Sequence, residues 1–262
     1  VGLSDIHFHI PESRLDLALL VKDRSQSEPR LGRHLERALR TTGQKDIRFP
    51  CVWEDTATMA AQAAHGLLSR AGTGRLANLR HLAVGTETTV DQSKPVSAYV
   101  QGMLQRSGVE VPERVSSFQV QHACAGATMS LLSVGSMLAA GGRGGEAGLV
   151  IASDIARYQT RTTAEVTQGA GALALLLELS PRLLELDVVN VGYCSRDVDD
   201  FFRPVGSHLA QVRGRYSMDC YLESLEGAFL DHCRRAGLSP QQALTDSELI
   251  MLHTPFRNMP ES

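Results

Sequence analysis

Apolar runs alternate with longer stretches of helical composition along the first half of the chain. Residues 79–85 and 148–154 are short apolar runs that end in polar residues, as buried strands do. Residues 54–70 and 93–105 carry small and apolar residues at helical spacing, with acidic residues opening the first segment and Pro95 early in the second. This alternation predicts a layered α/β fold with a largely buried sheet.

The flanking segments are predicted from the same patterns. Residues 6–10 alternate and stop at a proline, which indicates a strand, and residues 216–236 are predicted to form a helix. Residues 249–252 are an apolar run that predicts a last strand. Residues 22–48 are polar and irregular apart from a helical patch at 31–39, so a mobile loop or flap is expected there.

The balance of charges excludes some classes of function. A formal net charge of -3 over 262 residues argues against a general nucleic-acid binder. The arginine-rich groups at 33–37 and 213–215 are expected to be solvated faces, although either could meet an anionic carrier group. His7 and His9 would share one strand face, but no third ligand is near, so surface or edge histidines are favoured over a metal pair.

The cysteines and the apolar stretches indicate the expected compartment. The five cysteines are odd in number and form no C-x-x-C pair, so a reducing cytoplasm is favoured over a disulfide framework. The first residues show no basic segment followed by an apolar core, so no signal peptide is expected. Residues 123–142 form the longest weakly polar run, and its hydroxyl side chains and glycines favour a buried helix of a soluble protein over a membrane span.

The most informative stretch surrounds Cys124, at residues 121–128. A β-rich run at 115–120 leads into it, and a helix of small and apolar residues at 125–140 leads out. Because a helix N-terminus carries unpaired N–H groups and the positive end of the helix dipole, it favours a thiolate over a thiol. On local sequence alone, the alternative is a small buried cysteine that fills a core.

Six motifs, in one order along the chain, resemble a known family. They are VGTETTVDQSK at 84–94, HACAGAT at 122–128, ASDIARY at 152–158, EVTQGAGA at 165–172, DFFRP at 200–204 and HTPF at 253–256. Together they resemble the 3-hydroxy-3-methylglutaryl-CoA synthases of the thiolase superfamily, including the relatives that carry out β-branching in polyketide assembly lines.

The resemblance implies a thiolase-like layered α/β fold of two similar halves, usually assembled as a homodimer. Residues 1–183 would form the N-terminal half with Glu87 and Cys124, and residues 184–262 would form part of a C-terminal half with His253. Chains of this family continue past the histidine motif with further strands, a site asparagine and a glycine-rich segment. The second half is therefore expected to be incomplete and to expose apolar surface.

The resemblance also implies the chemistry of the site. Cys124 would take an acetyl group from acetyl-CoA as a thioester, and Glu87 would help to remove a proton from the acetyl methyl group. His253 would donate to the ketone oxygen of the second substrate. Asp154 and Asp200 match acidic positions near the family's site and are assigned supporting, orienting roles. CoA thioesters are the implied substrates, with no metal and no further cofactor.

The sequence is compatible with several functions. The first is the condensing enzyme of isoprenoid precursor supply in the mevalonate pathway, which joins acetyl-CoA and acetoacetyl-CoA. The second performs the same chemistry on a β-ketone held by an acyl carrier protein, although the motifs at 167–169 and 200–204 resemble the first branch more. The third is an inactive scaffold or partner subunit, against which the intact Glu87, Cys124 and His253 count. A type III ketoacyl synthase is a further alternative, but it lacks an equivalent of Glu87.

Overall fold

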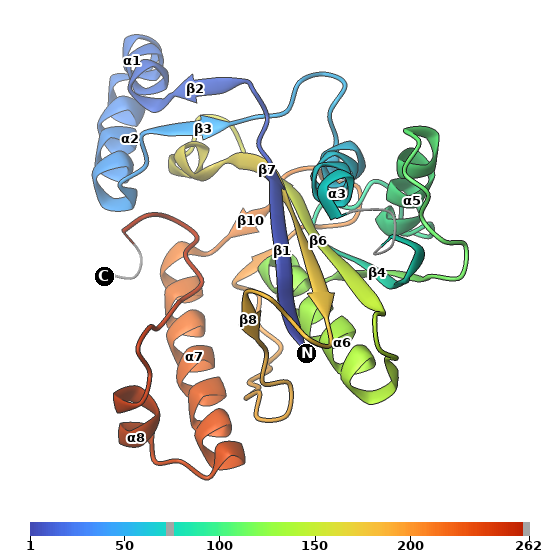
Figure 1. The fold of residues 1–262 in the computed structure, drawn as a ribbon. Coiled ribbons are helices and arrows are strands. Elements are labelled where there is room, and N and C mark those ends of the chain that lie inside the picture. Colours follow the sequence, from blue (N-terminus) through green and yellow to red (C-terminus); the bar gives the residue numbers. More distant parts are fainter. Residues whose placement is uncertain (72–75, 259–262) are drawn as a thin grey trace. The chain divides into compact units, whose positions relative to one another are not determined.

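The computed structural model describes residues 1–71 and 76–258 (Figure 1). Its contacts divide the chain into two compact units. Unit 1 comprises Val1–Leu20, Lys45–Ala156 and Gln168–Leu186, and unit 2 comprises Val21–Gln44, Arg157–Thr167 and Asp187–Ser262. The change of unit after Leu186 lies close to the expected boundary at 183, whereas two earlier segments group with unit 2. The division into two similar halves stays a prediction.

A six-stranded mixed sheet forms the centre of unit 1 within the described residues, in the order β5-β4-β6-β7-β1-β8. Its strands are β1 (Gly2–His9), β4 (Leu79–Thr86), β5 (Ser116–Gln121), β6 (Ala147–Ala156), β7 (Gly169–Glu178) and β8 (Leu184–Glu185). β4 runs parallel to both β5 and β6, whereas β7 is antiparallel to β6 and to β1. Two short strands, β2 (Arg14–Asp16) and β3 (Asp46–Arg48), form a separate ribbon.

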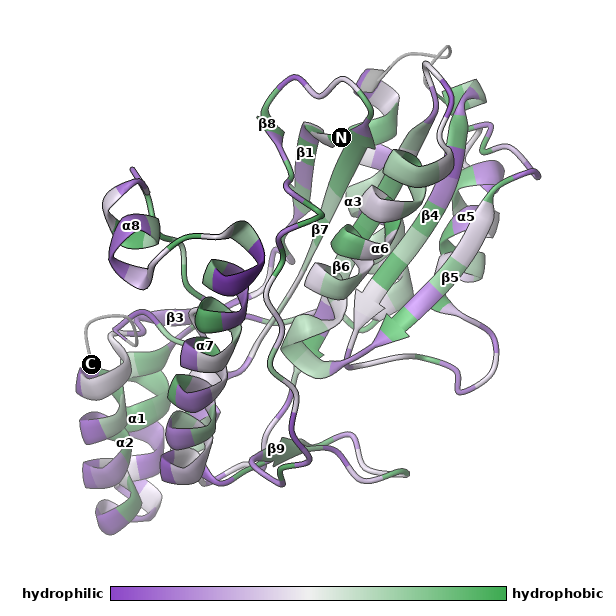
Figure 2. Cartoon of the chain, turned by 90° about the horizontal axis from the view of Figure 1, so that it is seen from below, coloured by the Kyte–Doolittle hydropathy of each residue, from purple (hydrophilic) through white to green (hydrophobic). Residues whose placement is uncertain are grey.

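Helices cover both faces of this sheet, as Figures 1 and 2 show. The helices are α3 (Thr56–Ala71), α5 (Val96–Arg106) and α6 (Gly126–Gly141). Alternate residues of β4 enter opposite cores: Leu82 and Val84 pack in the core beneath α3 and α5, and Ala83 packs in the core beneath α6. The predicted layered α/β fold with a buried sheet is confirmed.

Helix α6 packs on the sheet through one stripe of residues. Ser130, Val134 and Leu138 are buried at four-residue spacing, whereas Met137 is 39% exposed. Ala123–Gly141 is the single helical stretch among the described residues that is long and apolar enough to cross a membrane, and 28% of it is buried. Its contacts with β4 and β6 show that α6 covers the sheet. The predicted buried helix is therefore confirmed for the face of α6 that packs on the sheet.

Residues 22–48 form helices where a mobile loop or flap was expected. The two helices are α1 (Leu17–Ser27) and α2 (Pro29–Thr42). α2 buries Leu31 and Leu35, and Gly43 ends it in the left-handed conformation at φ 69°. The loop prediction was wrong because a helix with one narrow apolar stripe is polar in overall composition, as the mixed colouring of α2 in Figure 2 illustrates.

A partly buried ion pair joins α1 to the short 3-10 helix η2 (Thr163–Thr167) within unit 2. Arg24 Nε and Nη2 donate to the two carboxylate oxygens of Glu165 at 3.2 and 2.9 Å. The hydrogen bond to Glu165 raises the pKa of Arg24, which burial alone would lower. The bidentate geometry holds α1 and η2 in one orientation to each other.

The remainder of unit 2 combines one long helix with irregular segments. It contains β9 (Phe201–Phe202), β10 (Gln211–Val212), α7 (Gly214–Ala236) and α8 (Pro240–Thr245). The helix predicted at 216–236 is confirmed, but residues 249–252 are irregular and 38 to 81% exposed instead of forming a strand. A strand needs a neighbour that accepts its hydrogen bonds, and within the described residues no strand pairs with this segment.

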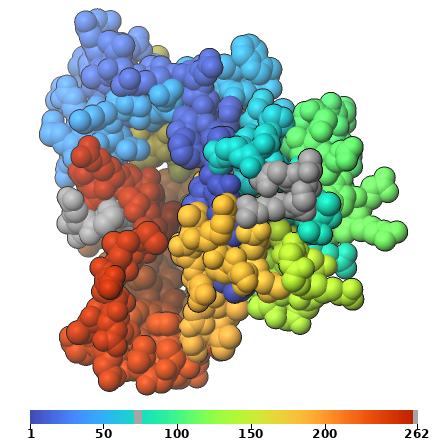
Figure 3. All heavy atoms as spheres, viewed as in Figure 1, coloured from blue at the N-terminus to red at the C-terminus, as the bar shows by residue number. Residues whose placement is uncertain are grey.

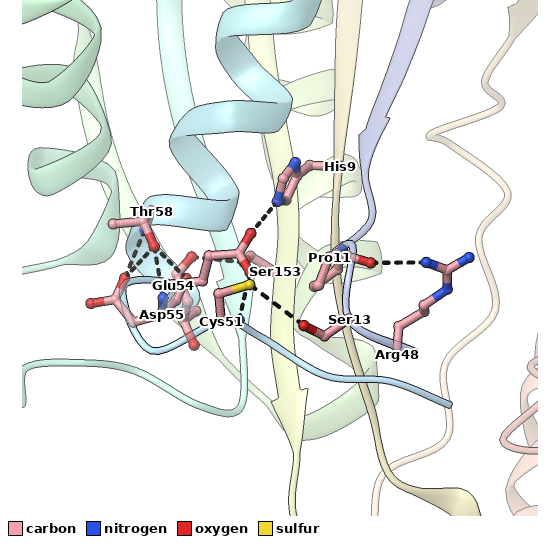
Figure 4. A network of polar contacts seen from close by, with 10 residues as sticks. His9, Pro11, Ser13, Arg48, Cys51, Glu54, Asp55, Thr58 and Ser153 are labelled. Carbon is pink, nitrogen blue, oxygen red and sulfur yellow. Dashed lines mark hydrogen bonds and ion pairs between the residues drawn. The ribbon is translucent and has the colours of Figure 1, made fainter. Parts of the chain in front are cut away.

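Glu54 ties the loop that precedes α3 to strand β1 (Figure 4). Its Oε1 lies 2.8 Å from His9 Nε2, and its Oε2 accepts the Cys51 N–H at 2.8 Å. The Glu54 N–H donates to the Cys51 carbonyl at 3.0 Å, which closes a tight turn. His7 and His9 are half-buried and pair with β7, whereas β8 pairs only with Gly2 and Leu3 of β1, so both histidines lie at an edge of the sheet as predicted.

The contacts of Glu54 predict a stability that depends on pH. Burial pushes the pKa of Glu54 up, but the hydrogen bonds from Cys51 and His9 outweigh burial and leave it lowered. Such a carboxylate stabilises the fold above its unfolded pKa of about 4.3 and loses this effect as pH falls through its folded pKa. We expect Glu54→Ala to reduce the free energy of unfolding by about 1–3 kcal/mol at pH 7 and by less near pH 4.

Urea unfolding at both pH values measures this effect. Glu110→Ala, which removes an exposed carboxylate, is the matched control and should leave the unfolding curve nearly unchanged. An equal loss of stability at pH 7 and pH 4 in the Glu54 variant would contradict the role of the ionised carboxylate.

Candidate active site

Three parallel strands bring the predicted site residues of unit 1 to one edge of the sheet. β4 lies between β5 and β6 and runs parallel to both, so the three carboxyl ends adjoin. Glu87 directly follows β4, Cys124 follows β5 within a short turn, and Asp154 lies near the end of β6. The prediction that Glu87 and Cys124 stand at strand ends is confirmed, and sites commonly form at such ends in α/β sheets.

Cys124 lies in a single 3-10 turn, η1 (Ala123–Ala125), immediately before α6. Ala123 has a φ of 38°, which is strained for a residue with a Cβ atom. The Ala125 N–H donates to the His122 carbonyl at 2.9 Å and closes the turn. The chain thereby bends sharply from β5 into α6 and leaves Cys124 exposed at the start of the helix.

Two glycines let the start of α6 approach the end of β4. A Cβ atom on Gly85 would lie 2.2 Å from the backbone nitrogen of Ala127 and 2.3 Å from the carbonyl carbon of Gly126. A Cβ atom on Gly126 would lie 2.9 Å from the Val120 carbonyl oxygen. Any side chain at Gly85 would therefore push the turn that carries Cys124 away from β4, the strand that Glu87 follows.

Asp154 holds the turn that carries Glu87. Its Oδ1 accepts the Thr86 hydroxyl, the Glu87 N–H and the Thr88 hydroxyl at 2.8 Å each, and the Thr88 N–H at 3.1 Å. Burial raises the pKa of Asp154, while these hydrogen bonds act in the opposite direction. One carboxylate oxygen thus fixes the backbone on both sides of Glu87.

The N-terminus of α3 supports the same turn. The Thr56 hydroxyl donates to the Thr88 carbonyl at 2.7 Å, and the Ser153 hydroxyl donates to the Thr56 carbonyl at 2.7 Å. Sequence reasoning assigned no role to Thr56, Thr86 or Thr88. The threonines on either side of Glu87 are the sequence feature that could have indicated this contact, because a threonine hydroxyl group can donate a hydrogen bond to a nearby carboxylate.

The other two predicted site residues belong to unit 2. Asp200 precedes β9, and its Oδ2 accepts the Ser217 hydroxyl at 2.9 Å near the start of α7. His253 follows the irregular segment at 249–252, and its carbonyl accepts the Tyr221 hydroxyl at 3.3 Å. Partial desolvation lowers the pKa of His253, which favours its neutral form. Glu87, Cys124 and Asp154 thus share unit 1, and Asp200 and His253 share unit 2.

The groups of unit 1 suit acyl transfer. A thiol stands before a helix whose first N–H groups carry no side-chain cap, and a carboxylate follows the adjoining strand. Uncapped N–H groups can stabilise an oxyanion, and a carboxylate can remove a proton from carbon. No group of three or more potential metal ligands occurs in the part of the chain that the structure describes.

Comparison with known proteins identifies the family. The family described as "Hydroxymethylglutaryl-coenzyme A synthase N terminal" matches residues 2–181. The chain belongs to the hydroxymethylglutaryl-CoA synthase family. The Hydroxymethylglutaryl-CoA synthase of Haloferax volcanii is 36% identical over 231 residues, which cover 88% of this chain and 51% of that protein. The Enterococcus faecalis protein of the same name is 29% identical over 259 residues, 99% of this chain and 62% of that protein.

Solved structures of hydroxymethylglutaryl-CoA synthases share the fold. "MvaS in complex with 3-hydroxy-3-methylglutaryl coenzyme A" superposes with a TM-score of 0.84 at 35% identity, over 99% of this chain and 60% of that one. The curacin pathway HMG synthase, at 24% identity and a TM-score of 0.77, shares the fold over 89% of this chain and 53% of its own. The chain therefore has the expected thiolase-like layered α/β fold, and it spans about half to three fifths of its relatives' length.

Proposed function

We propose that the protein carries the acyl-transfer site of a hydroxymethylglutaryl-CoA synthase. In this reaction acetyl-CoA, acetoacetyl-CoA and water yield 3-hydroxy-3-methylglutaryl-CoA. The observation that supports this most strongly is the pair of adjoining strand ends that carry Cys124 and Glu87 in a chain of this family. A carbon–carbon bond-forming acyltransferase needs both a nucleophile and a base in one place.

Cys124 starts the reaction. Its thiolate attacks the carbonyl carbon of acetyl-CoA, the carbon–sulfur bond to CoA breaks, and the acetyl group remains on Cys124 as a thioester. Negative charge on the carbonyl oxygen would be stabilised by backbone N–H groups at the start of α6. The exposed position of the thiol before the helix supports this role.

Glu87 would then act as the base for the condensation. Its carboxylate removes a proton from the acetyl methyl group, and the resulting carbanion attacks the ketone carbon of acetoacetyl-CoA. His253 would donate a proton to the ketone oxygen as it becomes an alkoxide. Water then hydrolyses the thioester, which releases the product and returns the thiol of Cys124.

Asp154 and Asp200 would position other groups. The four hydrogen bonds to Asp154 support a role in fixing the backbone of Glu87. The Ser217 contact of Asp200 supports an orienting role at the start of α7. Both residues would thus act through neighbours, and the enzyme would need no metal or further cofactor beside its CoA thioesters. A homodimer in the cytoplasm is the assembly and location that we infer.

Acetylation of Cys124 tests the proposal directly. Incubation with acetyl-CoA should add one acetyl group to the intact protein, and peptide mass spectrometry should place it on Cys124. Cys124→Ala should accept none, and Cys233→Ala, which changes a buried cysteine of unit 2, should be acetylated like the parent protein. A folded protein that gains no acetyl mass would support the scaffold alternative instead.

A further inference from the structure

Gln119 of β5 contacts both ends of the segment that runs from Glu87 to α5. We call this segment, residues 88–95, the β4–α5 segment. Gln119 is half-buried on the strand that leads to the candidate nucleophile. Its Oε1 accepts the Thr89 hydroxyl at 3.3 Å, near the start of the segment, and the Val96 N–H at 2.8 Å, directly after its end. One carboxamide oxygen thus joins β5 to the segment that follows the candidate base.

The contact with Gln119 supplies a cap for the start of α5. The residue before the helix is Pro95, whose side chain has no acceptor for the first helical N–H groups. Val96 is 0% exposed, so water cannot satisfy its N–H. A capping oxygen normally comes from the residue before the helix, whereas here it comes from a neighbouring strand. Loss of this oxygen would leave a buried donor without its acceptor and would loosen the first turn of α5.

The β4–α5 segment is also held by hydrogen bonds of its own. Asp91 Oδ1 accepts the N–H groups of Ser93 and Lys94 at 2.8 and 2.9 Å. Asp91 Oδ2 accepts the Tyr99 hydroxyl of α5 at 3.0 Å, and the Thr89 hydroxyl also lies 2.7 Å from the Asp91 carbonyl oxygen. Because these contacts stiffen the segment, a shift at one end is transmitted to the other end.

The first residue of the segment is bonded directly to Glu87. Thr88 donates its N–H and its hydroxyl to Asp154, and its carbonyl accepts the Thr56 hydroxyl. At the far end, α5 packs on α3, β4 and β5 on one side, and its green spheres lie at the surface in Figure 3. The position of Glu87 therefore depends on Asp154 and also on a segment whose far end is held by Gln119.

We propose that Gln119 is a positioning residue, which fixes Glu87 relative to the strand that leads to Cys124 through the β4–α5 segment. This inference rests on the proposed function, because it assigns Gln119 to the condensation step. Cys124 itself is held by its 3-10 turn and by the close approach at Gly85, and neither contact includes Gln119. Acetylation requires the thiol, whereas condensation also requires the base at the acetyl methyl group. Loss of the Gln119 oxygen therefore slows condensation more than acetylation.

Two variants separate the acceptor oxygen of Gln119 from the size of its side chain. Gln119→Met nearly keeps the length of the side chain and removes the oxygen, whereas Gln119→Glu keeps an oxygen that can accept both hydrogen bonds. A negative charge at the start of a helix is also favoured by the helix dipole. In single-turnover assays, Gln119→Met should slow condensation about tenfold or more and leave acetylation of Cys124 within about twofold of the parent rate. Gln119→Glu should condense within about threefold of the parent rate.

Amide hydrogen exchange, followed by NMR, measures the same contact without turnover. The Val96 N–H should exchange slowly in the parent and about tenfold or more faster in Gln119→Met, because its acceptor is gone. Gln119→Glu should keep this N–H protected. Exchange at residues 130–138 of α6 should be the same in all three proteins, because this part of the helix packs on the sheet away from Gln119.

Gln101→Met is the matched control, because it makes the same replacement at another half-buried glutamine, on α5 itself. Its amide donates to the Pro112 carbonyl at 3.4 Å. The control should keep the parent rates of both steps and the parent exchange of the Val96 N–H. If Gln119→Met reduces folding, Thr89→Val should still fold, because it keeps the shape of the side chain and removes only a hydroxyl. Thr89→Val should then show a smaller loss, confined to condensation.

Several results would overturn the inference. Unchanged exchange of the Val96 N–H in Gln119→Met would show that the contact does not hold the start of α5. An equal loss in acetylation and condensation would assign Gln119 to the stability of the whole unit, and failure of Gln119→Glu to condense would show that the acceptor oxygen is not what matters. A parent protein that shows no acetylation or no condensation contradicts the proposed function, while faster exchange in Gln119→Met would still support the contact, since exchange needs no substrate.

Discussion

Glu87→Gln should leave acetylation of Cys124 within a few-fold of the parent rate and reduce condensation with acetoacetyl-CoA by about 10²–10⁴-fold. The amide keeps the size of the side chain but cannot accept the proton of the acetyl methyl group. Asp154 binds the backbone N–H at this position, so the turn keeps its anchor in the variant. Single-turnover assays with radiolabelled acetyl-CoA would separate the two steps.

The variant Asp154→Asn distinguishes the role of Glu87 as the base from the role of Asp154 in holding the turn that carries Glu87. This variant changes the charge of the residue that holds the turn and keeps Glu87 itself. It should slow condensation less than Glu87→Gln does, and it should lower thermal stability, because one acceptor oxygen serves four donors. Condensation by Glu87→Gln within tenfold of the parent rate would show that another group removes the proton.

Gly85→Ala should reduce both stability and acetylation. The added methyl group would meet the backbone of Gly126 and Ala127 at 2.2–2.4 Å, and backbone atoms cannot move aside as a flexible side chain can. Overpacking of this kind costs about 1–3 kcal/mol. The start of α6 must then shift away from β4, which moves Cys124 relative to Glu87 and slows the step that depends on their separation.

Gly102→Ala is the matched control for this prediction. Gly102 lies on α5, and a Cβ atom there meets nothing closer than the tip of Arg106 at 3.4 Å. Alanine also favours helix over glycine by about 0.5–1 kcal/mol, so this variant should be as stable as the parent or more stable. Chemical unfolding and the rate of acetyl-enzyme formation measure both variants. A Gly85→Ala protein with parent stability and parent acetylation would contradict the close approach.

Much of unit 1 was predictable because its signals are local. Strands β4 and β6 are short apolar runs that end in polar residues, β5 lies in the β-rich run at 115–120, and the segments at 54–70 and 93–105 have helical composition. The positions of Glu87 and Cys124 at strand ends followed from where those runs stop. The family resemblance then added chemical roles that no single motif carried.

Two predictions of secondary structure were wrong. In one segment the local pattern was ambiguous, and in the other an expected strand has no partner strand. The segment at 22–48 is polar overall, yet Leu31 and Leu35 bury one stripe of α2 and make it a helix. Residues 249–252 have the composition of a strand but pair with no strand among the described residues, so they stay irregular and exposed. Local composition predicts a tendency to form a helix or a strand. Whether that element forms depends on burial against, or pairing with, other parts of the chain.

The sequence by itself determined the layered α/β fold, the candidate nucleophile and base, and the family. The tertiary structure alone decided how those residues are held. Gly85 became important through the backbone of α6, more than 40 residues later, and Asp154 through its hydrogen bonds to residues 86–88. The close backbone approach at Gly85 and the hydrogen bonds shared by Asp154 both involve residues that are distant in the sequence. Only folding brings such residues together.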